Sequence, residues 1–376
     1  MKQIINARIV LPDGIIENGS IAFNDKIVAI TDNNKKRCKA EVIDANGKTV
    51  IPGLIDLHIH GYLGADASDG DVEGVVKMAD GVAKNGVTAF LPTTMTLSYD
   101  ELEKAFDSVR EAKSTGTPNG AEILGVHAEG PFINVKRCGA QRKDCIVKPD
   151  AEFLLKHSDI VKMVTIAPET DEDFAVIKEV TSKSDMVVSA GHTDADFDTA
   201  MASIEAGVTH ATHLFNAMPA LTHRGPGLIG AALNSDKVSC ELICDTFHIH
   251  PALFKVIFKT KGDKFNAITD CMRAGGLPDG EYTLGGQPVF VKGIKCLLAD
   301  GVIAGSVLKL NNAVKNLVDN GLSINEAVNS ASLYPAKTLG LENERGSLEV
   351  GKKADVVICD NEFNVVEVYR DGNKIV

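Results

Sequence analysis

The sequence contains no uninterrupted apolar run of about 18 residues, the length that a membrane-spanning helix needs. Its first residues, MKQIINARIVLPDG, offer one lysine and a short strand-like run but no long apolar segment. We therefore expect neither a transmembrane helix nor a secretory signal. None of the eight cysteines forms a CxxC pair. Scattered thiols of this kind are typical of a reduced protein, so we predict a cytoplasmic location.

Positive charge is also scarce, because 39 lysines and arginines face 51 aspartates and glutamates, for a formal net charge of −12. Nucleic acids and anionic membranes are bound by basic surfaces, so we expect neither as a partner. A small anionic substrate is compatible with this composition if a local positive pocket overcomes the overall field.

With 376 residues and 44% apolar content, the chain is long enough for one large α/β barrel with an appendage, or for two domains. Residues 1–51 and 344–376 both read as short strands between turn residues, and neither segment has enough apolar residues for its own core. We predict that they pair into one small β-sandwich domain and that residues 52–343 form the other domain. The charged run 32–39 is predicted to be a solvated loop.

The middle of the chain holds short apolar runs separated by helix-like segments. The runs cover 50–60, 87–94, 122–130, 161–169, 186–192, 209–216, 238–245 and 264–270. Helical spacing follows at 71–86, and again at 98–114, where Ser98 and Glu101 have the spacing of a capping box. Eight strands with crossover helices predict an α/β fold of the (β/α)8 TIM-barrel type. A doubly wound sheet is the alternative, but it usually carries a glycine-rich phosphate loop after its first strand.

That position holds His58-Ile59-His60 instead. Residues i and i+2 of a strand point to the same face, so the two imidazoles are expected to stand side by side at the end of the first strand. Such a pair suits a transition metal. Taken alone, it more often reflects two packed or surface histidines.

Other polar residues lie at or near the ends of the later runs, and the carboxyl ends of barrel strands are where TIM barrels place their chemistry. Together these positions are His58, His60, Glu129, His192, His213, Asp245 and Asp270. The set predicts a site for one or two divalent metal ions, with zinc or iron ahead of manganese or cobalt. Glu129 can bridge two ions, and Asp270 can accept a proton from water or bind a metal.

The remaining histidines are interpreted separately. His127 and His210 precede proposed ligands and are expected to face the barrel wall or to support a ligand. His157 lies in an amphipathic segment and is predicted to be at the surface, whereas His248, in the loop after the seventh run, is a candidate substrate contact.

Several motifs resemble one known family. They are PGLIDLHIHG (52–61), HAEGPFIN (127–134), AGHTDA (190–195), THLFNAM (212–218), HRGPG (223–227), DTFHIHP (245–251), TDCMRAGG (269–276) and IAGS (303–306). They are similar to the amidohydrolase superfamily and, within it, to the N-acetylglucosamine-6-phosphate deacetylase family. The resemblance implies a metal-dependent hydrolase of amino-sugar metabolism that converts N-acetylglucosamine 6-phosphate to glucosamine 6-phosphate and acetate.

The resemblance also implies roles for individual residues. Glu129, His192 and His213 match the family's main metal site, His58 and His60 match a second metal site, and Asp270 matches the catalytic acid/base. The implied substrate-binding residues are Ala140, Gln141, Asn216, Ala217, Arg224, His248, Ile303, Ala304 and Gly305. In the family, the counterparts of Arg224 and His248 can reach the phosphate of a neighbouring subunit, which implies a homodimer. Gln141 departs from the family's frequent histidine, which leaves the substrate preference open.

Two alternatives belong beside this interpretation. One is another amidohydrolase that acts on a related N-acyl sugar or a cyclic amide. Many of those enzymes use a carbamylated lysine after the fourth strand, but the run 161–169 ends without lysine. The other is a barrel that has lost its activity and serves as a scaffold, although here every ligand position is filled.

Overall fold

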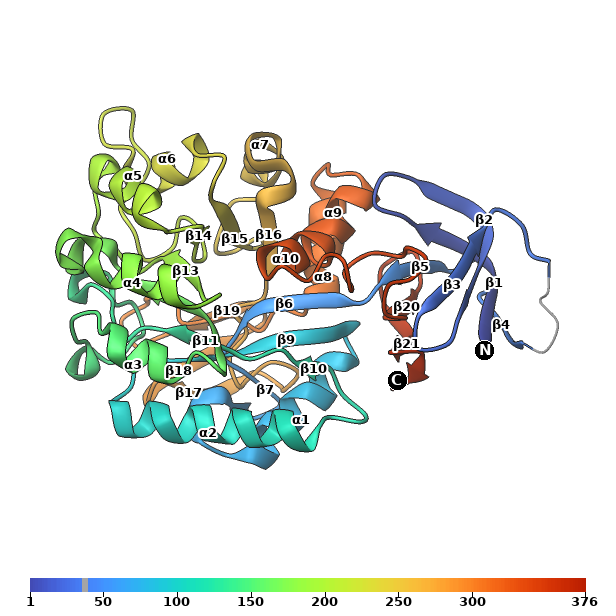
Figure 1. Ribbon diagram of the computed structural model, residues 1–376, viewed down its shortest axis with the longest axis horizontal. Coiled ribbons are helices and arrows are strands. Elements are labelled where there is room, and N and C mark those ends of the chain that lie inside the picture. The colour runs from blue at the N-terminus through green and yellow to red at the C-terminus, as the bar shows by residue number, and fades with distance from the viewer. Residues whose placement is uncertain (36–39) are drawn as a thin grey trace.

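The computed structural model describes residues 1–35 and 40–376. Its centre is a barrel of parallel strands that follow one another in sequence order (Figure 1). The strands are β6 (Leu54–Ile59), β9 (Val87–Thr94), β11 (Val126–Glu129), β12 (Val161–Ile166), β13 (Val187–Ala190), β14 (His210–Ala211), β15 (Ser239–Ile243) and β16 (Phe265–Ile268). Each lies within one of the predicted apolar runs, so the TIM-barrel prediction is confirmed.

The barrel is nearly closed where its first and last strands meet. Along this seam, the amide of Asp270 donates to the carbonyl of His58 at 2.9 Å, and the Thr269 hydroxyl donates to Asp56 at 2.6 Å. The amide of His60 donates to the carbonyl of Cys271 at 2.8 Å. The seam thus brings the ends of β6 and β16 together, with polar side chains on both.

Helices surround the barrel (Figure 1). They are α1 (Val72–Ala83), α2 (Tyr99–Thr115), α3 (Ala151–Lys156), α4 (Ala175–Lys183), α5 (Phe197–Ala206), α6 (Gly227–Asn234), α7 (Ala252–Lys261), α8 (Leu310–Asp319), α9 (Ile324–Ser330) and α10 (Leu333–Thr338). The predicted capping box at the start of α2 is present, with Ser98 and Glu101 each bonding the other's backbone amide. In the described part of the chain, no helix is long and apolar enough to cross a membrane.

Both ends of the chain contribute to a second, mixed sheet. Its strands are β1 (Lys2–Val10), β2 (Ile15–Phe23), β3 (Ile27–Thr31), β4 (Glu41–Asp44), β5 (Thr49–Pro52), β20 (Val356–Cys359), β21 (Val365–Arg370) and β22 (Asn373–Lys374). β5 and β20 pair antiparallel and join the two termini, and residues such as Ile4, Ile21 and Val356 form a separate apolar cluster. The domain boundaries given above stay a prediction. Part of the predicted solvated loop, 36–39, lies outside the described residues.

Two features differ from the sequence-based expectation. A small antiparallel sheet of β17 (Gly280–Leu284), β18 (Gln287–Lys292) and β19 (Lys295–Leu297) follows the last barrel strand and was not predicted. The prediction of a surface His157 was wrong, because its side chain is buried beside the rings of Phe106 and Phe153. An amphipathic segment buries one face, and the imidazole lies on that face.

Candidate metal centre and active site

Three predicted ligands meet at the carboxyl ends of β11, β13 and β14. Oε1 of Glu129, the last residue of β11, lies 3.2 Å from Nε2 of His192 and 2.9 Å from Nε2 of His213. The two Nε2 atoms are 3.1 Å apart. Both histidines have left-handed backbone, with φ of 47° and 27°. Strained backbone of this kind is often kept at functional sites.

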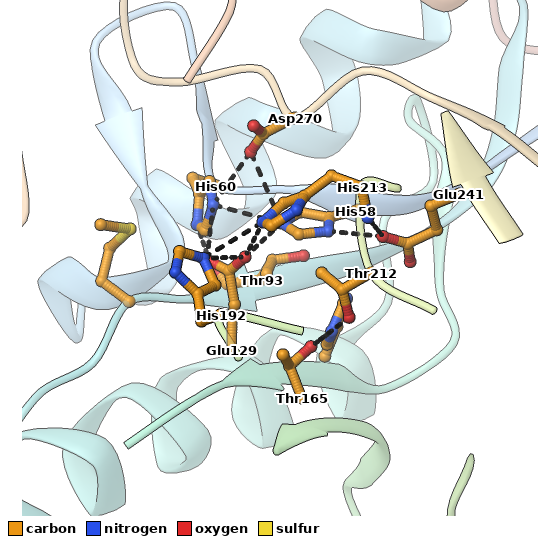
Figure 2. A network of polar contacts seen from close by, with 12 residues as sticks. His58, His60, Thr93, Glu129, Thr165, His192, Thr212, His213, Glu241 and Asp270 are labelled. Carbon is orange, nitrogen blue, oxygen red and sulfur yellow. Dashed lines mark hydrogen bonds and ion pairs between the residues drawn. The ribbon is translucent and has the colours of Figure 1, made fainter. Parts of the chain in front are cut away.

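A second group forms around the histidine pair at the end of β6 (Figure 2). Nε2 of His60 lies 3.1 Å from Oδ1 of Asp270 and 3.3 Å from Oε2 of Glu129. Nε2 of His58 lies 3.4 Å from Oε1 of Glu129 and 3.3 Å from Nε2 of His60. Glu129 therefore stands between the two groups, with its carboxylate in contact with both.

The buried carboxylates govern the protonation of these imidazoles. Burial lowers the pKa of His58, but Glu129 and Glu241 outweigh it and raise the value to about 9. Burial likewise opposes protonation of His60, and hydrogen bonds with Asp270 and Glu129 raise its pKa well above the usual range. In the absence of other cations, the cluster therefore attracts protons. A metal ion takes the place of such protons when it binds.

The donor set fits a divalent metal. Each Nε2 atom faces other acceptor atoms at 2.9–3.5 Å, a crowding that needs a cation between them. The ligand atoms of His58, His60 and Asp270 lie within 4.8 Å of one another, as do those of Glu129, His192 and His213. Imidazole nitrogen and carboxylate oxygen suit zinc and other first-row metals.

Behind this cluster lies a residue that the sequence analysis did not select. Glu241 on β15 is fully buried, and its Oε2 lies 2.9 Å from Nδ1 of His58 (Figure 2). Its Oε1 lies 3.2 Å from Nε2 of His210. The signal that could have revealed Glu241 is an acidic residue in the middle of the apolar run 238–245, where a charge is costly to bury. His127 and His210 both support the cluster. The ring of His127 lies edge-on to that of His58, with ring centroids 4.6 Å apart, and its nitrogens contact the carbonyl of Leu57 and the hydroxyl of Thr165. His210 contacts Ser239 and Glu241.

A cavity of about 290 Å³ opens above the cluster. His60, Glu129, His192, His213 and Asp270 line it, together with Ala140, Gln141, Asn216, Ala217, His248 and Ile303 to Gly305. It thus contains every implied substrate-binding residue except Arg224. Arg224 is exposed in the loop before α6 and does not line the cavity of its own chain. Met95, Gly139, Leu284 and Val302, which the sequence analysis did not name, complete the wall.

Two polar residues that line the cavity, His248 and Gln141, are held in place by hydrogen bonds with neighbouring residues. Asp245 accepts hydrogen bonds from the backbone amides of Phe247 and His248, and its Oδ2 lies 2.7 Å from Nδ1 of His248. Asp245 therefore orients His248 and lies away from both metal groups. Gln141 accepts a hydrogen bond from the amide of Thr96 at 2.6 Å and donates one to Oε2 of Glu129. Its amide group is thereby fixed against a predicted metal ligand.

A TIM barrel with histidines and carboxylates gathered at its strand ends defines the class of metal-dependent hydrolases. The sequence pattern described as "Amidohydrolase family" matches residues 49–375, and the chain belongs to this family. N-acetylglucosamine-6-phosphate deacetylase of Bacillus subtilis is 40% identical over 97% of this chain and 94% of its own length.

Solved structures agree with this relationship. N-acetylglucosamine-6-phosphate deacetylase from Pasteurella multocida has a TM-score of 0.93 and 30% identity, with 99% of each chain covered. A variant of the Mycobacterium smegmatis deacetylase, solved in complex with N-acetyl-D-glucosamine-6-phosphate, has the same score and identity and covers 100% of this chain and 99% of its own. The resemblance noted in the sequence is therefore confirmed at the level of the whole fold.

Proposed function

We propose that this protein hydrolyses the acetamide of N-acetylglucosamine 6-phosphate, giving glucosamine 6-phosphate and acetate. The observation that carries the proposal is the meeting of Asp270 with two imidazole–carboxylate groups in one cavity. Several relatives that match nearly the full chain are deacetylases of this substrate, one is an N-acetylgalactosamine-6-phosphate deacetylase, and one structure was solved with N-acetyl-D-glucosamine-6-phosphate. A cyclic-amide substrate is less well supported, because β12 ends in Ile166 and the bridging position is occupied by Glu129.

The residues that would hold the metal are Glu129, His192 and His213 for one ion, and His58, His60 and Glu129 for a second. Zinc or iron suits these ligands best. When bound, such an ion lowers the pKa of a water molecule and polarises a carbonyl oxygen. Gln141 contributes by holding Oε2 of Glu129 in place.

Asp270 is the proposed acid/base. Burial raises its pKa, but His60, His58 and His213 outweigh this effect and lower the pKa below the usual value. The carboxylate is thus ionised and ready to accept the proton of the attacking water. It then returns that proton to the nitrogen of the leaving amine, since an amine leaves far more readily than its anion. His248, oriented by Asp245, contacts the sugar phosphate in this proposal.

The phosphate also needs a stronger cation. Among the described residues that line the cavity, none is a lysine or an arginine. Arg224 is exposed on a loop and available to reach beyond its own chain. We therefore propose a homodimer in which Arg224 of one copy binds the phosphate held in the cavity of the other.

The proposed location is the cytoplasm. Seven cysteines, all those among the described residues, are buried free thiols. A reducing compartment keeps thiols in this state.

The test is acetate release by purified protein supplied with zinc or with iron(II) under reducing, anaerobic conditions. The panel comprises N-acetylglucosamine 6-phosphate, its galacto epimer and unphosphorylated N-acetylglucosamine, with the Asp270→Asn variant as the blank. Dihydroorotate, whose hydrolysis releases no acetate, is followed separately by the opening of its ring. Highest kcat/KM on the first substrate is expected. Faster turnover of the epimer would reassign the sugar, and the absence of acetate from every N-acetyl sugar would refute the proposal.

A further inference from the structure

Glu241 is a buried acidic residue that the catalytic proposal does not use. It lies in the interior of β15, is fully buried, and does not line the cavity. Its carboxylate contacts three hydrogen-bond donors: Nδ1 of His58 at 2.9 Å, Nε2 of His210 at 3.2 Å and the backbone amide of His213 at 3.1 Å. A charged carboxylate at such a position is costly unless something positive balances it.

No lysine or arginine in the described part of the chain contacts Glu241. His210 places Nε2 toward Glu241, and its Nδ1 lies 2.6 Å from the hydroxyl of Ser239, which can donate to it. A neutral His210 therefore satisfies both of its contacts. The remaining partner is His58, whose other nitrogen points into the predicted metal centre.

The contact with Glu241 also decides which nitrogen of His58 is free. A carboxylate only accepts hydrogen bonds, so Nδ1 of His58 must carry the proton. Nε2 is then the nitrogen left to bind a metal ion in place of a proton, and it faces His60, Glu129 and Asp270 at 3.3, 3.4 and 3.5 Å. Figure 2 shows this line from Glu241 through His58 to the cluster. Carboxylate–imidazole pairs of this geometry orient metal-binding histidines and make them more basic.

We infer that Glu241 is a positioning residue for the second proposed ion, because it holds His58 in the orientation that the histidine pair of β6 needs to bind metal. The inference extends the proposed function, since it rests on the metal content of the same cavity. It assigns to Glu241 an action through His58 and gives it no contact with substrate. The Glu241 carboxylate also accepts a hydrogen bond from the backbone amide of His213, whose φ is 27°. It therefore contacts one residue of each metal group.

The experiment measures metal binding to the metal-free protein directly, by titration with zinc and by counting ions per chain after gel filtration. Wild type is expected to bind two ions, and Glu241→Gln to retain the first and to bind the second about 10–100-fold more weakly. Gln keeps the size of the side chain and an oxygen for the His213 amide, but it removes the charge. Glu241→Asp should recover part of the lost affinity.

His210→Gln is the matched control. An amide nitrogen replaces Nε2 of His210 and disturbs the same buried network, while the Glu241 charge stays in place. This variant is expected to bind both ions. Equal loss of the second ion in His210→Gln and Glu241→Gln would attribute the effect to general disruption of the core and overturn the inference.

A double-variant cycle tests the route through His58. If Glu241 acts through that imidazole, adding Glu241→Gln to a His58→Gln variant should change the affinity for metal little further. Independent, additive losses would contradict the inference, as would one tight ion per chain in wild type. Neither result bears on acetate release, so the proposed reaction and the role of Glu241 can fail separately.

Discussion

Oδ1 of Asp270 lies 3.1 Å from Nε2 of His60, so the carboxylate that follows the last barrel strand meets an imidazole from the end of the first. Asp270→Asn should keep the shape of this contact but remove the group that accepts a proton. We expect kcat to fall by about 10²–10⁴-fold while the metal content stays unchanged. Steady-state acetate release and ion counting on the same sample check both parts, and near-normal turnover would exclude the acid/base role.

Gln141 links the backbone of Thr96 to Glu129, and its removal should loosen the carboxylate that both metal groups share. Gln141→Ala is expected to lower metal affinity or kcat/KM by about 10–100-fold. Gln287→Ala is the control, because Gln287 also bonds this loop, through the carbonyl of Ala140 at 2.8 Å, without contacting a metal ligand. Similar losses in the two variants would indicate that loop position, and not Glu129, is responsible.

Arg224 gives a prediction about subunits. Arg224→Ala should impair the phosphorylated sugar far more than unphosphorylated N-acetylglucosamine. If the arginine acts across a dimer, mixing this variant with Asp270→Asn and allowing the subunits to exchange creates hybrid dimers with one complete site. Random pairing should then restore about a quarter of the wild-type activity. If the mixture is no more active than either variant alone, Arg224 does not act in the active site of the neighbouring subunit.

Removal of metal should destabilise the protein, because the ligands lie on different strands of the barrel. A ligand that binds only the folded state, at a free concentration of 100 times its Kd, adds about 2.7 kcal/mol to the free energy of unfolding. Thermal melts before and after chelation, followed by addition of zinc, measure this difference. An unchanged melting temperature would mean that the ligand cluster holds no tightly bound ion.

Arg345 supports a prediction about the contact between the barrel and the terminal sheet. Its side chain is 2% exposed and pairs with Glu122 of β10 (Glu122–Ile123) and with Asp355, which is also buried. Burial raises the pKa of Asp355, and Arg345 opposes that rise. Arg345→Met leaves Asp355 without this cation and should cost about 3–5 kcal/mol of stability.

Lys353→Met is the comparison for Arg345→Met. Lys353 contacts the same Glu122 at 3.3 Å but is 27% exposed, so its loss should cost less than about 1 kcal/mol. Denaturant unfolding of both variants provides the measurement. Equal effects would show that burial does not set the strength of these ion pairs.

The barrel and the ligand cluster could be predicted from sequence because both follow simple periodic rules. Apolar runs marked the strands, and His192, His213 and Asp270 stood just beyond them, where chemistry collects in a TIM barrel. Glu241 was not predicted, because it lies inside a strand and not at its end, and because it contacts the ligands without lining the cavity. The short sheet at 280–297 was not predicted, because a strand such as β18 alternates buried and exposed residues and lacks the continuous apolar run of a barrel strand.

The role of Arg224 was predicted only through the family resemblance. Sequence patterns and a single chain describe contacts within that chain, and this arginine is exposed there. Its proposed role requires a second copy. Substrate recognition by a dimer is therefore beyond what periodicity or strand order can indicate.

The spacing of the ligands along the chain bears on how the protein is made. The proposed ligands begin at His58 and include Glu129 and His213, while Asp270 closes the cluster across the seam between β6 and β16. A growing polypeptide that has left the ribosome only as far as β13 carries the histidine pair and Glu129 but lacks His213, Glu241 and Asp270. The ligand set for the first ion is incomplete until His213, just after β14, joins Glu129 and His192, and Asp270 reaches the cluster only with the last strand. Ion uptake is thus expected late in biosynthesis, after most strands of the barrel have formed.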